Sequence, residues 1–134
     1  MKSNFTNGRK AVIAFVCFAI AVIGFMIKLP SGFRHIDKEL HALFYFMAAA
    51  FLNWLFAKAK LLRHIIIFIF LFLFGMAIEY AQQYSNKFFR TRIHGRFDPE
   101  DIQSNCKGLL AFSIVWLAWI AIARVFQKNR RKSI

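Results

Sequence analysis

The sequence predicts an all-α fold, a transmembrane four-helix bundle that forms one domain over residues 1–134. Hydrophobic residues make up 59% of the chain, and the mean hydropathy is +0.48. These values are typical of an integral membrane protein and too high for a soluble domain of this length. Four apolar runs, expected as helices over residues 11–29, 39–57, 64–84 and 99–125, match the roughly 20 residues that a helix needs to cross a bilayer.

The net charge of +13 raises nucleic-acid binding as an alternative function. The basic residues, however, lie at the ends of the apolar runs, whereas a helix that binds nucleic acid carries them along one face. We therefore expect the lipid bilayer as a partner and no nucleic acid.

The first apolar run contains 17 uncharged residues, 11–27, after a short basic start. No small-x-small cleavage site follows it, so we expect a retained transmembrane helix and not a cleaved signal peptide. In the second run, Asp37, His41 and Tyr45 are spaced i, i+4, i+8 and share one helix face.

The third run follows a short basic link, residues 58–63, which predicts that the second and third helices are antiparallel neighbours. Its 14 uncharged residues, 65–78, end at Glu79, with Gln82 and Gln83 on the same face. An unpaired, ionised carboxylate at this depth costs about 2.5–3.5 kcal/mol or more, so we expect Glu79 to face the bundle interior.

The fourth run has a well-marked start. Asp98 is a suitable N-cap, Pro99 fits the first helical position, and Asp101 falls where a capping box places its reciprocal partner. Asp101, Asn105 and Gly108 are spaced i, i+4, i+7, so one face carries an acid, an amide and a glycine that allows another helix to approach closely.

Charge asymmetry predicts the orientation. The N-terminal segment, the 58–63 link and the C-terminal tail carry 11 of the 19 Lys and Arg residues and none of the six Asp and Glu residues. The positive-inside rule therefore places both termini in the cytoplasm, and the polar cluster formed by the acid-bearing helix ends at the extracytoplasmic side.

Three segments carry a family resemblance: D-K-E-L-H-A-L-F-Y at 37–45, E-Y-A-Q at 79–82, and R-F-D-P-E-D-I-Q-S-N-C-K-G at 96–108. Together they resemble the VanZ-like family of small integral membrane proteins. The resemblance implies a multi-pass protein of the inner (cytoplasmic) membrane, and it suggests a link to glycopeptide (teicoplanin) resistance or another cell-envelope function. Arg96 best matches the family arginine by its spacing to Asp101.

The polar residues predict an outward-facing pocket that binds an anionic envelope lipid or a lipid-linked cell-wall intermediate, and the resemblance adds a glycopeptide as a further candidate ligand. Arginines would hold phosphate or carboxylate through paired hydrogen bonds. If chemistry occurs, Glu79 and His41 are the acid/base pair, and the sequence leaves open whether the protein is an enzyme. The remaining residues expected to bind the ligand are Asp37, Lys38, Tyr45, Gln82, Arg90, Arg92, Arg96, Asp101 and Asn105.

Other interpretations of the same residues stay open. Asp37 and His41 have the i, i+4 spacing of a metal pair that Glu79 or Asp101 could complete, but an Asp–His hydrogen bond that orients the ring is commoner, so we predict neither metal nor cofactor. A structural or accessory protein, whose polar residues only hold the helices together, is the main alternative. A small transporter or channel is a weaker one, because no polar stripe crosses the first or third run completely.

Overall fold

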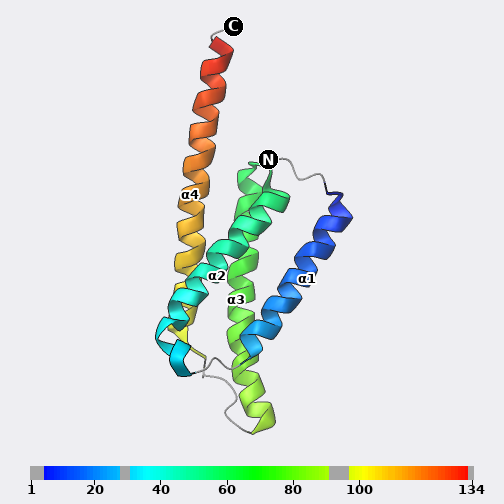
Figure 1. Ribbon diagram of the computed structural model, residues 1–134, viewed down its shortest axis with the longest axis vertical. Helices are drawn as coiled ribbons and strands as arrows, with labels where there is room; N and C mark the ends of the chain where they lie inside the picture. Colours follow the sequence, from blue (N-terminus) through cyan, green and yellow to red (C-terminus); the bar gives the residue numbers. More distant parts are fainter. Residues whose placement is uncertain (1–4, 28–30, 91–96, 133–134) are drawn as a thin grey trace.

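The computed structural model describes residues 5–27, 31–90 and 97–132, and every regular element within these ranges is helical. The four helices α1 (Asn7–Met26), α2 (Asp37–Leu52), α3 (Leu61–Phe89) and α4 (Pro99–Lys132) run alongside one another (Figure 1). A short 3₁₀ helix, η1 (Ser31–Ile36), precedes α2, and a π-helical turn, η2 (Asn53–Ala57), continues it. Four helical segments are long and apolar enough to span a bilayer, which confirms the predicted helices of a multi-pass membrane protein.

The helix ends differ from the predicted limits because polar residues extend the helices beyond the apolar runs. Helix α1 begins at Asn7 instead of residue 11, since the Thr6 hydroxyl oxygen caps it by accepting from the Arg9 N–H at 3.4 Å. Helix α3 continues to Phe89 and α4 to Lys132, past the predicted ends at residues 84 and 125. Hydropathy locates the apolar stretch, whereas helical hydrogen bonding continues past it.

The junction between α2 and α3 is a tight turn. Lys58 and Ala59 adopt left-handed backbone conformations, with φ values of 46° and 59°, and reverse the chain after η2. The carbonyls of Leu55 and Phe56 accept hydrogen bonds from Lys10 Nζ at 3.1 Å and from an Arg63 guanidinium nitrogen at 3.0 Å. Basic side chains from the neighbouring helices thus satisfy carbonyls that a helix end would otherwise leave without a partner.

Helix α2 packs most extensively against α4, and a glycine sets their separation. A Cβ atom added to Gly108 would lie 2.1 Å from the Ala42 carbonyl oxygen, so the two backbones approach too closely for any side chain. This contact confirms the close approach predicted at Gly108. The core around it contains Tyr45, Ala49, Leu71, Leu109 and Phe112.

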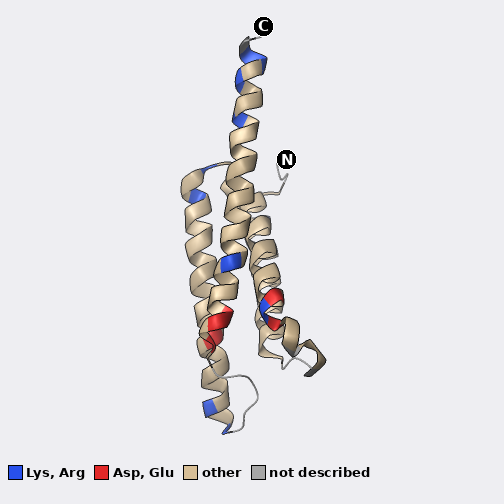
Figure 2. Cartoon of the chain, turned by 90° about the vertical axis from the view of Figure 1, so that its left-hand side faces the viewer, with Lys and Arg blue, Asp and Glu red and all other residues tan. Residues whose placement is uncertain are grey.

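Helix α1 lies against α3, where the ring of Phe18 packs edge-on to Phe70 and Phe74. Large apolar side chains are exposed on the outer faces of all four helices, as expected for surfaces that contact lipid. Asp and Glu gather toward one end of the bundle, and the 58–60 link and the end of α4 lie toward the other (Figure 2). Basic residues occur at both ends.

Candidate functional site

Polar side chains from three helices meet near the end of the bundle where α2 and α4 begin. We call the following six residues the His41 cluster: Asp37, His41 and Tyr45 on α2, Glu79 on α3, and Asp101 and Asn105 on α4. All except Asp37 are buried. Helix α3 continues for ten residues, roughly 15 Å, beyond Glu79 and flanks the cluster on one side.

The His41 ring is oriented by Asn105. Its Nδ1 lies 2.9 Å from the Asn105 amide oxygen, which only accepts hydrogen bonds, so Nδ1 carries a proton and donates it. In the neutral ring, Nε2 is therefore left with a lone pair that can accept a hydrogen bond or bind a cation. The bond joins α2 to α4 across the interface that Gly108 keeps narrow.

The Nε2 atom of His41 faces two carboxylates. Nε2 lies 3.9 Å from Asp37 Oδ1 and 4.0 Å from Asp101 Oδ2, distances too long for hydrogen bonds. The predicted Asp37–His41 hydrogen bond is therefore wrong: Asn105 orients the ring instead. The His41 side chain is 7% exposed and that of Asp101 is 12% exposed, whereas Asp37 is 34% exposed and forms the open side of the group.

Glu79 connects α3 to the start of α4. Its Oε2 accepts a hydrogen bond from the Asp98 backbone N–H at 3.2 Å, whereas Oε1 is buried without a hydrogen-bond partner. Asp98 itself caps α4 as predicted, because its Oδ1 accepts from the Glu100 N–H at 2.8 Å. The predicted capping box is wrong, because Glu79 and not Asp101 occupies the Asp98 N–H.

Two further polar atoms in the cluster are buried and have no hydrogen-bond partner within residues 5–27, 31–90 and 97–132: the Tyr45 hydroxyl and Asp101 Oδ1. Gly75 makes room for this arrangement, since a Cβ there would lie 2.8 Å from the Asn105 amide nitrogen and 3.0 Å from the Tyr45 hydroxyl. Buried polar atoms in native proteins are nearly always hydrogen-bonded, so three exceptions in one place indicate a site for a missing partner.

The other residues expected to bind a ligand lie elsewhere. Lys38 forms an exposed ion pair with Glu100, which joins the first turns of α2 and α4. The Gln82 amide donates to the Phe25 carbonyl at 2.8 Å and holds α1 to α3, while Gln83 is exposed. Arg90 is exposed at the left-handed end of α3. Arg92 and Arg96 lie outside the described residues.

A second buried polar group, which we call the His64 network, is not predictable from any sequence motif. His64 Nδ1 lies 2.8 Å from the Asn53 amide oxygen, and Nε2 lies 3.0 Å from the Ser113 hydroxyl. The Asn53 amide nitrogen donates to the Ala49 carbonyl at 2.8 Å, and the His64 ring stacks on Trp116 at a centroid distance of 4.2 Å. The only signal in the sequence is that Asn53 interrupts an apolar run and His64 lies directly before one.

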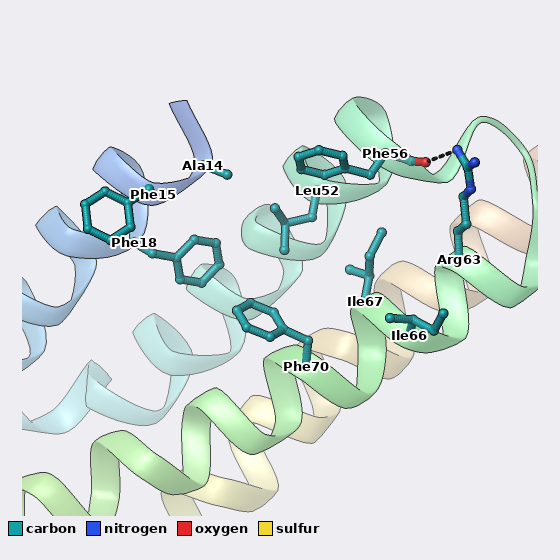
Figure 3. Close-up of a pocket in the computed structure, with 9 residues that line it drawn as sticks. All are labelled: Ala14, Phe15, Phe18, Leu52, Phe56, Arg63, Ile66, Ile67 and Phe70. Carbon is teal, nitrogen blue, oxygen red and sulfur yellow. Dashed lines mark hydrogen bonds between the residues drawn. The ribbon is translucent and has the colours of Figure 1, made fainter. Parts of the chain in front are cut away.

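An apolar cavity of about 460 Å³ lies between α1 and the α2–α3 pair. Phe18 of α1 points toward Leu52 of α2 and Phe70 of α3, and Arg63 lies at the margin of the cavity (Figure 3). Its lining comes from the end of α2 and the start of α3, away from the His41 cluster. It contributes no polar group to the site.

Comparison with protein-family models, with curated proteins and with solved structures finds no match to this chain. The fold therefore defines the class, a multi-pass helical membrane protein, and the function rests on the chemistry of the His41 cluster.

Proposed function

We propose that this chain is a VanZ-like protein of the cytoplasmic membrane whose His41 cluster binds the headgroup of an anionic envelope lipid or lipid-linked cell-wall intermediate. One observation carries the proposal: Glu79 and Asp101 each bury a carboxylate oxygen that has no hydrogen-bond partner among the described residues. Groups that only hold helices together have no need for such atoms, because an unsatisfied buried polar group destabilises the fold.

The chemistry of the cluster favours a ligand with hydrogen-bond donors. Carboxylates accept hydrogen bonds, so the free oxygens of Glu79 and Asp101 suit sugar hydroxyls or amide N–H groups. An anionic phosphate on the same ligand needs cations, which Arg90, with Arg92 and Arg96, would supply at the extracytoplasmic surface. A lipid-linked sugar intermediate combines both kinds of group with an apolar chain that stays in the bilayer.

Any reaction at this site would use Glu79 and His41. Glu79 keeps Oε1 free while Oε2 is held by the Asp98 N–H, and His41 has a fixed tautomer. Such a pair can accept and return a proton at a bound headgroup. The link to teicoplanin resistance stays a prediction from the family resemblance.

A structural or accessory role is the second candidate, and a specific observation favours it. The Glu79–Asp98 and His41–Asn105 hydrogen bonds both join separate helices, as interhelical polar contacts in membrane proteins do. In that case the cluster would only hold the helices together and would bind no ligand.

Thermal unfolding of the full-length protein in detergent separates these two functions. We expect a polyprenyl-phosphate-linked sugar lipid to raise the melting temperature of the wild type by several degrees, and phosphatidylglycerol to raise it less. E79Q and D101N should melt near the wild type without lipid and lose the shift, as should R96A, whereas E39Q at an exposed acid should keep it. Early melting of E79Q and D101N, with no lipid shift in the wild type, would establish the structural role.

A further inference from the structure

The three residues around His41 Nε2 form a set of metal-ligand atoms. One carboxylate oxygen each from Asp37 and Asp101, together with the imidazole nitrogen, lie within 4.8 Å of one another. We propose that Asp37, His41 and Asp101 bind a divalent zinc-like cation with a fourth position open to water or substrate. This assignment goes beyond the envelope ligand, and its test does not depend on it. With a cation at Nε2, His41 would be a ligand, and Glu79 alone would accept and return a proton.

The hydrogen bond to Asn105 holds the His41 ring in an orientation suited to binding a metal. In metal sites, a ligating histidine donates its other ring N–H to a fixed acceptor, which sets the tautomer and aims the free nitrogen. Asn105 serves as that acceptor for His41, with a Nδ1–Oδ1 distance of 2.9 Å. Nε2 faces two carboxylate groups at 3.9 and 4.0 Å, so the field there favours a positive charge on that nitrogen, which a proton or a metal cation supplies.

The charge of the three ligand residues and the burial of the neighbouring Glu79 also fit a divalent cation. Two carboxylates and one neutral imidazole carry a charge of −2, which a divalent cation neutralises. Within the described residues, no lysine or arginine forms an ion pair with Asp101 or Glu79. Glu79, which interacts electrostatically with both His41 and Asp101, is 1% exposed, and its Oε1 has no hydrogen-bond partner. It can accept a hydrogen bond from a metal-bound water.

The number and type of the ligand atoms favour zinc over Mg²⁺ and Ca²⁺. Imidazole nitrogen and carboxylate oxygen are both zinc ligands, and three protein ligands with one open position is the arrangement of catalytic zinc sites, whereas Mg²⁺ and Ca²⁺ prefer six or more oxygen ligands. Two ligands of a tetrahedral zinc ion lie about 3.4 Å apart, so the 3.9 and 4.0 Å distances to His41 need a contraction of about 0.6 Å, and the whole set, which lies within 4.8 Å, needs at most about 1.4 Å. Asp37, half-buried at the first residue of α2, can rotate to provide it.

Metal retention by the full-length protein tests the assignment. After treatment with EDTA, the detergent-solubilised protein is dialysed against Zn²⁺ or Mg²⁺ without added lipid, and bound metal is measured by mass spectrometry. We expect one zinc ion per chain, at least tenfold weaker zinc binding in D37N and D101N, and little retention of Mg²⁺. Substitution of the orienting residue, N105A, should weaken binding about 10- to 100-fold.

Matched controls keep the test specific. E39Q removes an exposed acid from the same helix as Asp37, and H35N removes an exposed histidine close to it, so both should bind zinc like the wild type. With Co²⁺, the wild type should show the intense visible absorption of a four-coordinate site, and H41N should lose it. D37N lies at the margin of the cluster and should fold even if H41N does not.

Two results would overturn the metal site: no stoichiometric zinc in the wild type, or equal losses in D37N and E39Q. Either result leaves the envelope-ligand proposal standing if the lipid-induced thermal shift persists.

Discussion

The His41 cluster and the His64 network have the same partner at one histidine nitrogen and different surroundings at the other. Each contains a buried histidine whose Nδ1 donates to an asparagine oxygen, at 2.9 Å to Asn105 in the first and 2.8 Å to Asn53 in the second. The difference lies at Nε2. In the network it meets the Ser113 hydroxyl at 3.0 Å, whereas in the cluster it faces two carboxylates at 3.9 and 4.0 Å.

The network is complete in itself. His64 donates to Asn53, Asn53 donates to the Ala49 carbonyl, and the Ser113 hydroxyl has two acceptors within reach, the Leu109 carbonyl at 2.9 Å and His64 Nε2 at 3.0 Å, so each donor has an acceptor. In the part of the chain that the structure describes, the cluster instead leaves three buried polar atoms without a hydrogen-bond partner. A closed set of hydrogen bonds stabilises helix packing, while an open set that includes acids is suited to an external ligand. Burial of a polar residue in a membrane bundle therefore does not by itself distinguish a scaffold from a site.

The largest expected effect is a change in the backbone contact that builds the cluster. G108A places a Cβ against the Ala42 carbonyl and forces α2 away from α4, so we expect a loss of about 3 kcal/mol or more in unfolding free energy. Reversible unfolding in mixed micelles measures it. The control is G24A, where an added Cβ meets nothing within 4 Å. Equal stability of the two variants would contradict the close approach.

Removal of the two histidines sharpens the comparison. H64A leaves Asn53 and Ser113 without their partner and removes the stacking on Trp116, so we expect a loss of about 2 kcal/mol. H41A removes one hydrogen-bond partner, that of Asn105, whereas H64A removes two, so the loss in H41A should be smaller by about 1 kcal/mol. The same unfolding assay applies, and a larger loss in H41A would reverse the assignment of scaffold and site.

A smaller effect is expected at Gln82, which links α1 to α3. Q82A removes the hydrogen bond to the Phe25 carbonyl and should cost about 0.6–1.7 kcal/mol, the range of interhelical hydrogen bonds in membranes. Hydrogen exchange should rise in the last turn of α1 and stay unchanged at His64. Unchanged hydrogen exchange in α1 would contradict a stabilising Gln82–Phe25 hydrogen bond, and Gln82 would again be a candidate ligand-binding residue.

The smallest effect is expected at the exposed Lys38–Glu100 pair. K38Q should change the unfolding free energy by about 0–1 kcal/mol, because water and salt screen exposed ion pairs. The same assay at low and high salt should show little difference between wild type and variant. A loss as large as that of H64A would mean that the margin of the cluster is structural.

Local chemistry made part of this structure predictable. Apolar run lengths located four helices, Asp98 and Pro99 marked the start of α4, and Gly108 marked the closest helix contact. These features depend on neighbouring residues or on spacing within one helix. The exposed position of Gln83 and the Phe25 partner of Gln82 depend on how α3 is rotated against α1, which no spacing within α3 determines.

The same limit applies to the site. Shared helix faces brought attention to His41, Glu79, Asp101 and Asn105, but the acceptor for His41 Nδ1 comes from a helix 64 residues away in sequence. The His64 network shows the opposite case: its three polar residues lie on α2–η2, α3 and α4, and each alone resembles an interruption or the edge of an apolar run.

The most direct test of the distinction between scaffold and site is the unfolding free energy of E79Q relative to the wild type. Glutamine keeps the oxygen that accepts the Asp98 N–H and removes only the buried charge. If the cluster is a binding site, E79Q should be as stable as the wild type or more stable, because removal of an uncompensated buried carboxylate stabilises a membrane bundle. A loss as large as that of H64A would show that Glu79 belongs to the scaffold.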